Sequence, residues 1–123
     1  MPDRRRRRPA DPFLPLSPVV FDILLALSDG ERHGYGILQE VFLRSGGATR
    51  LRPGTLYRAL SRLLAEGLIE ESEERPAPDL DDERRRYYAL TALGVQVARA
   101  EAARLASLVR SARAKRVLRK ADA

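Results

Sequence analysis

The amino-acid sequence predicts a mainly helical fold with one small β-hairpin and a long C-terminal helix. Three observations indicate this fold class. Three segments in the first half of the chain carry apolar residues at helical spacing and are separated by Gly or Pro. Two runs of β-forming residues then flank a polar loop that contains Pro. The last third is rich in Ala, Leu, Val and Arg, which favours one long helix.

The first two helices are placed by residues that start and stop helices. Ser17 followed by Pro18 is a start signal, because the Ser oxygen can cap free backbone amides and Pro at the first helical position loses no needed hydrogen bond. The first helix should cover residues 18–28. The second follows the sequence RHGYG and should cover residues 35–45 before two glycines. We expect Leu51 to add one or two residues of short strand.

A third helix is expected between Pro53 and Gly67, since Pro is favoured at a helix start and Gly just past a helix end. At about 100° per residue, its leucines gather on one side and polar or cationic residues on the other. The leucines are Leu56, Leu60, Leu63 and Leu64. The opposite side carries Gly54, Thr55, Arg58, Ser61, Arg62 and Ala65, with Tyr57 at the border. The leucine side should face the core.

The β-hairpin is predicted from a change of period after Gly67. The runs LIEESE and RRYYAL are rich in β-forming residues, and the segment ERPAPDLDDE between them cannot continue a strand ladder. We therefore expect a hairpin with a long tip.

Thr91 should cap the long last helix, which is expected from about Ala92 to beyond Ala112 and has two apolar stripes. One stripe consists of Leu93, Val97 and Ala100, and the other of Ala98, Ala102, Leu105 and Val109. A domain this small can cover one stripe, so the second predicts a dimer interface. The alternative is that the helix folds back across its own domain and buries both. We assign residues 91–114 to a dimerisation helix and residues 115–123 to a basic tail.

The net charge of +6 suggests a polyanionic partner, but the charge is distributed unevenly. Residues 1–12 carry +3, residues 13–90 carry −3 and residues 91–123 carry +6. A nucleic-acid site in the middle of the chain must therefore arise from local placement of cations. The sequence has no Cys, which excludes disulfides, thiolate metal sites and Cys nucleophiles.

Residues 1–16 are rich in Arg and Pro and are expected to form a mobile arm. The run from Arg4 to Arg8 is either a solvated tail or an arm that contacts DNA phosphates or the minor groove. A basic run followed by an apolar run also has the outline of a secretory signal. Prolines and an Asp interrupt the apolar part, which is too short to span a bilayer. We therefore expect a cytoplasmic protein with no membrane partner.

Three helices followed by a hairpin is the order of a winged helix-turn-helix, which we assign to residues 17–90. In that fold the third helix enters the major groove of double-stranded DNA and the hairpin wing touches the backbone. A helix in the groove needs donors for base acceptors and few acids near phosphates, as the face opposite the leucines provides. The predicted DNA-binding residues are Gly54, Thr55, Tyr57, Arg58, Ser61, Arg62, Arg75, Arg84, Arg85 and Arg86.

Several alternatives remain open. The cations Arg58 and Arg62 could belong to an ordinary solvated helix face. The acidic wing tip, Asp79 to Glu83, would be repelled by DNA unless it points outward or pairs with the arginines. The chain could also be a winged-helix module that binds protein. An enzyme is not expected, because the sequence has a single His, no phosphate-binding loop and no evident carboxylate pair. We assign no chemistry to His33 and expect no metal or cofactor.

Three sequence blocks resemble the signature of PadR-type transcriptional regulators. They are HGYGI at 33–37, PGTLYRALSRLLAEGLIE at 53–70 and RRRYYALTALG at 84–94, within a resemblance that covers roughly residues 17–112. The single C-terminal helix is similar to the small subfamily. The resemblance implies a homodimeric repressor that uses its C-terminal helix for dimerisation and binds an inverted-repeat operator with the third helix and the wing. Our leading hypothesis adds release by a small hydrophobic effector that changes the angle between the two winged-helix heads.

The sequence departs from the family pattern in three places. Many relatives have a capping Ser where this chain has Arg52, and Pro where it has Arg58. Small relatives that bind flat aromatic drugs use a Trp in the dimer helix. This sequence has no Trp, so that ligand mode does not carry over.

Overall fold

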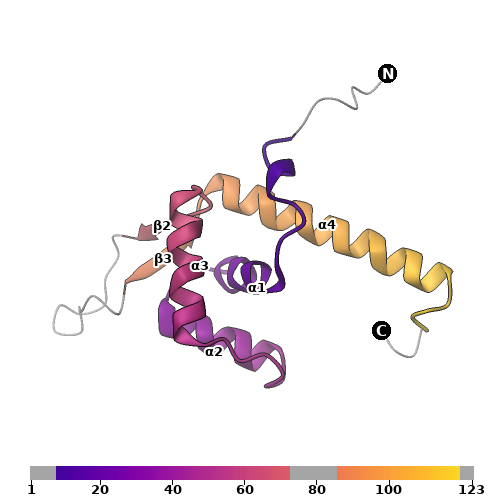
Figure 1. Ribbon diagram of the computed structural model, residues 1–123, viewed down its shortest axis with the longest axis horizontal. Coiled ribbons are helices and arrows are strands. Elements are labelled where there is room, and N and C mark those ends of the chain that lie inside the picture. The colour runs from indigo at the N-terminus through magenta and orange to yellow at the C-terminus, as the bar shows by residue number, and fades with distance from the viewer. Residues whose placement is uncertain (1–7, 73–85, 120–123) are drawn as a thin grey trace.

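The computed structural model describes residues 8–72 and 86–119 (Figure 1). The elements in chain order are η1 (Asp11–Phe13), α1 (Pro18–Leu27), β1 (Arg32–His33), α2 (Gly34–Arg44), α3 (Pro53–Ala65), β2 (Ile69–Ser72), β3 (Tyr87–Leu90) and α4 (Ala92–Ala114). Helix α1 contacts α2, α4 and β3, and the C-terminal half of α4 projects away from the other elements (Figure 1). This arrangement confirms the predicted fold class, a winged helix-turn-helix followed by one long helix.

The core is built from residues of all the α-helices and of the hairpin strands, and it sets which face of α3 is exposed. Ile23 and Leu24 of α1 are fully buried. On α3, Leu56, Leu60 and Leu63 are at most 1% exposed, while Leu64 is half-buried. The leucine side predicted from the helical period is therefore the buried side, and the cationic side is turned to solvent.

The sheet has three strands, in the order β1-β3-β2, and both pairings are antiparallel. The hairpin strands pair as predicted, with Ile69 opposite Leu90. The short third strand pairs Arg32 with Tyr88 and His33 with Tyr87. The prediction of strand at Leu51 was wrong: Leu51 is a buried core residue outside any strand. Arg32 and His33 have low β-propensity and form a strand because they pair with the edge of β3. Such tertiary pairing is not encoded in local propensity.

Side-chain caps begin three of the four α-helices. The Ser17 hydroxyl accepts a hydrogen bond from the Val20 amide at 3.2 Å, and Thr91 Oγ1 accepts one from the Gly94 amide at 3.0 Å. Both were predicted as caps. His33 caps α2 in the same way, since its Nδ1 accepts from the Gly36 amide at 3.0 Å. Helix α3 begins after Arg52 without a side-chain cap.

The first turn of α4 is fixed to the base of the hairpin. The Thr91 amide donates to the Leu68 carbonyl at 3.1 Å, and Thr91 Oγ1 donates to the Gly67 carbonyl at 2.6 Å. A Cβ at Gly94 would lie 2.0 Å from the Leu68 carbonyl oxygen, so only glycine permits this approach. Gly67 has a φ of +78°, which also favours glycine.

The chain preceding α1 packs more extensively than expected of a mobile arm. Ala10 is buried, and Phe13, Leu14 and Leu16 pack against the core. Element η1 contacts α4. The apolar side chains between the prolines supply this contact, so the expected arm of residues 1–16 joins the packed domain from Ala10 onward. Arg4 to Arg7 lie outside the described residues. No helix in the described part of the chain is long and apolar enough to cross a membrane.

Candidate nucleic-acid interface

The residues predicted to contact DNA from α3 share its solvent-facing side. Gly54, Arg58, Ser61 and Arg62 are exposed, Tyr57 is 39% exposed and Thr55 is half-buried. The helix starts at Pro53 because Pro is favourable at a first helical position. Buried leucines on the other side pack α3 against the core, so the position of its solvent-facing side is fixed.

Arg58 is placed close to the N-terminus of α3. Its Nη1 lies 3.5 Å from the position that a Cβ of Gly54 would occupy, so the side chain lies back over the first turn of the helix. Among residues 8–72 and 86–119, Arg58 forms no ion pair. Within these residues, its guanidinium has no charged partner to lose before it donates to an incoming acceptor.

Arg62 forms an ion pair with Glu66 one turn further along α3, with Nε 3.5 Å from Oε2. Glu66 follows the last residue of α3, and its side chain reaches back to Arg62. The Arg62 side chain is 78% exposed. An exposed ion pair of this kind contributes little, about 0.2–1 kcal/mol, so Arg62 remains available to another anion.

Tyr57 makes a contact that the sequence analysis missed. A Cβ on Gly34 would lie 2.5 Å from the Tyr57 hydroxyl oxygen, so the ring of Tyr57 packs onto the first residue of α2. The glycine that follows His33 is needed for this close approach. Tyr57 therefore fixes α3 against α2, and part of its ring remains accessible.

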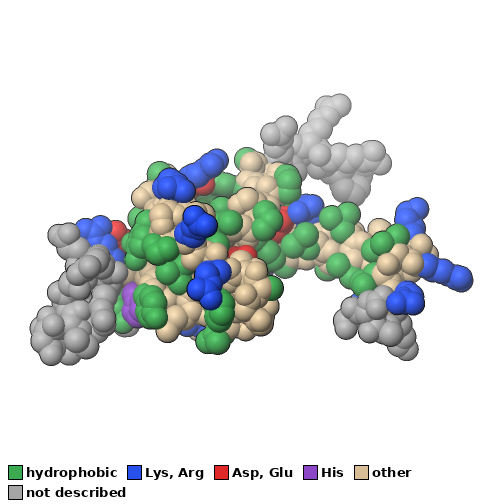
Figure 2. Space-filling model, turned by 60° about the horizontal axis from the view of Figure 1, so that its bottom comes forward, with side chains coloured by type: hydrophobic (Ala, Val, Ile, Leu, Met, Phe, Trp, Pro, Cys, Tyr) green, Lys and Arg blue, Asp and Glu red, His purple; other side chains and the backbone are tan. Residues whose placement is uncertain are grey.

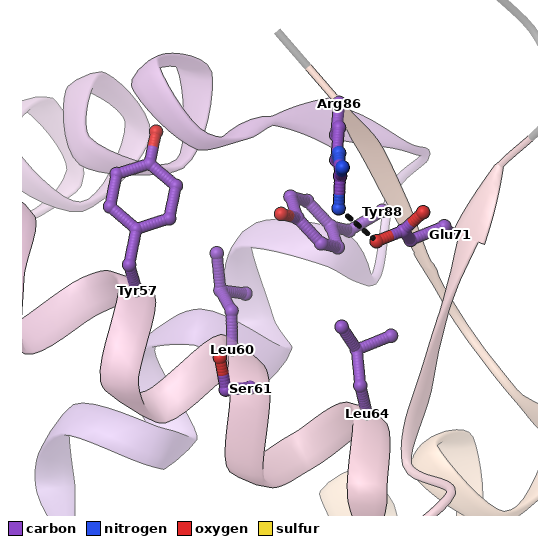
Figure 3. A pocket seen from close by; sticks show the side chains of 7 residues that line it. All are labelled: Tyr57, Leu60, Ser61, Leu64, Glu71, Arg86 and Tyr88. Atoms are coloured by element: carbon purple, nitrogen blue, oxygen red, sulfur yellow. Dashed lines mark hydrogen bonds and ion pairs between the residues drawn. The ribbon is translucent and has the colours of Figure 1, made fainter. Parts of the chain in front are cut away.

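A cleft of about 460 Å³ separates α3 from the hairpin (Figure 3). Leu60 and Leu64 of α3 line its apolar part together with Tyr88 of β3. Ser61 of α3 and the charged pair Glu71 and Arg86 are also among its lining residues (Figure 3). The cleft thus brings polar groups from both predicted DNA-binding elements around one space.

Arg86 stands just before β3 and pairs with Glu71 of β2, with Nη1 3.2 Å from Oε1. Both side chains are close to half exposed. The neighbouring Tyr88 is buried, and this burial raises the pKa of its phenol, with a smaller contribution in the same direction from the Glu71 charge. Arg86 was among the DNA contacts predicted from the sequence, but its partner Glu71 was not. The other predicted wing arginines, Arg75, Arg84 and Arg85, and the acidic tip from Asp79 to Glu83 lie outside the described residues.

Helix α4 carries the residues predicted to form a dimer interface. Ala98 is 9% exposed and belongs to the core of its own chain. Ala102 is exposed, Leu105 is half-buried and Val109 is 39% exposed. Leu108 is 55% exposed on the same part of the helix. Figure 2 shows hydrophobic side chains along the projecting part of α4, with Lys and Arg at its far end. The projecting half of α4 therefore presents an apolar surface that the described residues leave exposed.

His33 has a structural position. Besides capping α2, its ring lies edge-on to Tyr87, with centroids 5.4 Å apart. Within residues 8–72 and 86–119, no group of three or more His, Cys, Asp or Glu side chains is placed to hold a metal ion.

Solved structures of transcriptional regulators resemble this chain. A regulator from Clostridium thermocellum is 26% identical with a TM-score of 0.62, and the match covers 79% of this chain and 87% of that one. RosR of H. salinarum is 28% identical with a TM-score of 0.60, covering 80% and 79%. PadR of Bacillus subtilis, solved in complex with operator DNA, is 27% identical with a TM-score of 0.55, covering 67% and 45%.

One curated relative is an uncharacterised 37.1 kDa protein of transposon Tn4556 from Streptomyces fradiae, 40% identical over 86 residues. The match covers 70% of this chain but 22% of the relative, so the chain matches about a fifth of that protein's length. Residues 23–100, which include α2, α3, the hairpin strands and the first turns of α4, match the sequence profile of the PadR-like family. The chain therefore belongs to the transcriptional regulator PadR-like family.

Proposed function

We propose that this chain is a homodimeric repressor that binds an inverted-repeat operator in double-stranded DNA. The observation that carries the proposal is the exposed face of α3, on which Arg58 and Arg62 lie outward over a leucine-packed support. Residues 17–90 form the DNA-binding domain in this proposal. Arg58 and Thr55 face base edges, while Tyr57, Ser61, Arg62 and the wing arginines face the backbone.

The proposed dimer forms through the uncovered apolar surface of α4, within residues 91–114. Exposed apolar stripes of this length on a small domain are commonly covered by a second copy of the chain. A two-fold dimer places two recognition helices about 34 Å apart, which is one turn of the major groove. The family membership and the relative solved with operator DNA support a DNA partner.

The proposal includes release by a small hydrophobic effector. A symmetrical operator requires both copies of α3 to meet the groove at matching spacing. A ligand that changes the angle between the two winged-helix heads would therefore weaken operator binding without touching α3.

The test is selection of bound sequences from a random duplex pool with the purified chain. An inverted repeat with half-sites one helical turn apart is the expected result. Selection of a single, asymmetric half-site would contradict the dimeric arrangement. Absence of any enriched sequence would contradict specific DNA binding and would favour a protein-binding module.

A further inference from the structure

The ion pair between Glu71 and Arg86 occupies an unusual place for two exposed charges. Glu71 lies opposite Tyr88 in the register of β2 and β3, and Arg86 stands two residues before Tyr88. Side chains alternate across a strand, so Arg86, Tyr88 and Glu71 share the face of the hairpin that looks toward α3 (Figure 3). The carboxylate thus stands inside the cleft between the two elements proposed to contact DNA.

We propose that this cleft binds one DNA backbone phosphate, and that in the free protein the Glu71 carboxylate pairs with Arg86 in place of that phosphate. This inference rests on the proposed function. A carboxylate and a phosphodiester present similar oxygen acceptors to a guanidinium, so one can exchange for the other. Ser61 lines the same cleft and supplies a hydroxyl donor from α3.

The exchange gives Glu71 a positioning role. While DNA is absent, the 3.2 Å contact holds the Arg86 side chain over the cleft rather than in bulk solvent. When a phosphate enters, Arg86 turns to it and the Glu71 carboxylate is left beside an anion. Glu71 therefore opposes binding by competing for Arg86 and by repelling the phosphate. A variant with a neutral residue in place of Glu71 should therefore bind DNA more tightly than the wild type.

The matched control is available on the neighbouring residue. Glu70 is exposed on β2, but the alternation of the strand points it to the opposite face from Glu71. Glu71→Gln and Glu70→Gln therefore each remove one negative charge, from adjacent positions of the same strand. They differ in whether the carboxylate faces Arg86.

The experiment measures binding of the full chain to a fluorescently labelled duplex of mixed sequence over a series of salt concentrations. A backbone contact does not depend on sequence, so this probe is sufficient. Glu71→Gln should tighten binding about two- to fivefold at low salt. This is the change in binding constant that corresponds to losing the competing exposed ion pair. It should steepen the dependence of log affinity on log salt by up to about one. Glu70→Gln should change affinity by less than about twofold, because its field is screened.

Arg86→Gln provides the test of mechanism. In this background, Glu71→Gln should tighten binding less than it does in the wild type, since the competition for Arg86 is gone and only the repulsion between the Glu71 carboxylate and the phosphate remains. Equal effects of the two Glu variants in the wild-type background, or weaker binding by Glu71→Gln, would overturn the inference while leaving the proposed function intact. Failure of the wild-type chain to bind the duplex at any salt concentration would overturn both.

Discussion

Gly36 and Gly94 occupy equivalent positions in two helices but have different surroundings. Each is the third residue of its helix, and each donates its amide to the capping side chain, His33 for Gly36 and Thr91 for Gly94. A Cβ at Gly36 would lie 3.5 Å from the His33 ring, which is ordinary contact. A Cβ at Gly94 would lie 2.0 Å from the Leu68 carbonyl oxygen, which no side-chain adjustment can relieve.

Gly94→Ala should therefore lower the free energy of unfolding by about 1–3 kcal/mol or more, because α4 must move away from the hairpin. Gly36→Ala should be neutral or should raise it by up to about 1 kcal/mol, since Ala is the better helix former. Urea denaturation followed by circular dichroism measures both. Similar effects from the two substitutions would show that the close approach of α4 to Leu68 does not constrain the fold.

In the proposed complex, Arg58 is the arginine assigned to a base edge. If it donates to a guanine edge, Arg58→Ala should weaken operator binding by about 1–3 kcal/mol and relax sequence preference at one position of each half-site. Repeating the duplex selection with the variant measures this preference. Arg99→Ala on the exposed side of α4 is the control, and its selected sequences should match those of the wild type. A uniform loss of affinity across all sequences would assign Arg58 to the backbone instead.

Individual residues show how far sequence alone reaches. The outward direction of Arg58 follows from helical period and was predictable. The contact of Tyr57 with Gly34 joins two helices through tertiary packing, and nothing in the spacing of either segment encodes it. The pairing of Arg86 with Glu71 depends on the register of a hairpin whose tip carries no regular pattern, so the sequence indicated a cation without its partner.

The segment before α1 is held on α4 by a buried carboxylate. Glu101 is 2% exposed and forms two hydrogen bonds with Arg104, at 2.6 Å to Nε and 2.9 Å to Nη2. The Arg104 hydrogen bonds hold the pKa of Glu101 below the ordinary carboxyl value, against the opposing effect of burial. The backbone of Leu16, in the segment before α1, also favours the charged form of this carboxyl. One carboxylate thus joins α4 to the chain that leads into α1.

This pKa shift predicts how stability depends on pH. Because the folded-state pKa of Glu101 is lowered, its contribution is complete above the unfolded pKa near 4.5 and is lost as pH falls through the lower folded value. Glu101→Gln should lower the free energy of unfolding at neutral pH by about 1–3 kcal/mol and flatten its decline in acid. Urea titrations across this pH range measure the effect. Glu66→Gln, at an exposed pair, should cost less than about 1 kcal/mol and keep the wild-type slope.

Among the elements, those with strong local signals were predictable. Helix α1 starts at Pro18 after its Ser cap, α3 starts at Pro53, and α4 begins at Ala92 after Thr91. Strand β1 was not, because two residues have no period and form a strand only by pairing with β3. The packing of residues 10–16 was missed for a similar reason: their Pro-rich composition resembles a disordered arm, and burial against α4 overrides it.

The assembly of two chains is predicted to depend on the projecting half of α4. Leu105→Glu places a charge in the uncovered apolar stripe, so it should yield monomers and weaken operator binding. Ser107→Glu, on the polar arc of the same helix, adds the same charge and should leave the dimer intact. Sedimentation equilibrium measures both. A Leu105→Glu chain that still sediments as a dimer would place the interface elsewhere.

The contacts that Thr91 and Gly94 make at the base of the hairpin attach the start of α4 firmly to the winged-helix head. The 23 residues of α4 extend about 34 Å from a base that cannot swivel against the wing. When the winged-helix head and α4 turn together by about 5°, the tip of α4 moves by about 3 Å, so a displacement of that size at the tip turns the hairpin and its neighbour α3 by about 5°. A relative movement of two copies at the far end of α4 would therefore rotate each winged-helix head as a whole and change how its α3 meets the DNA major groove.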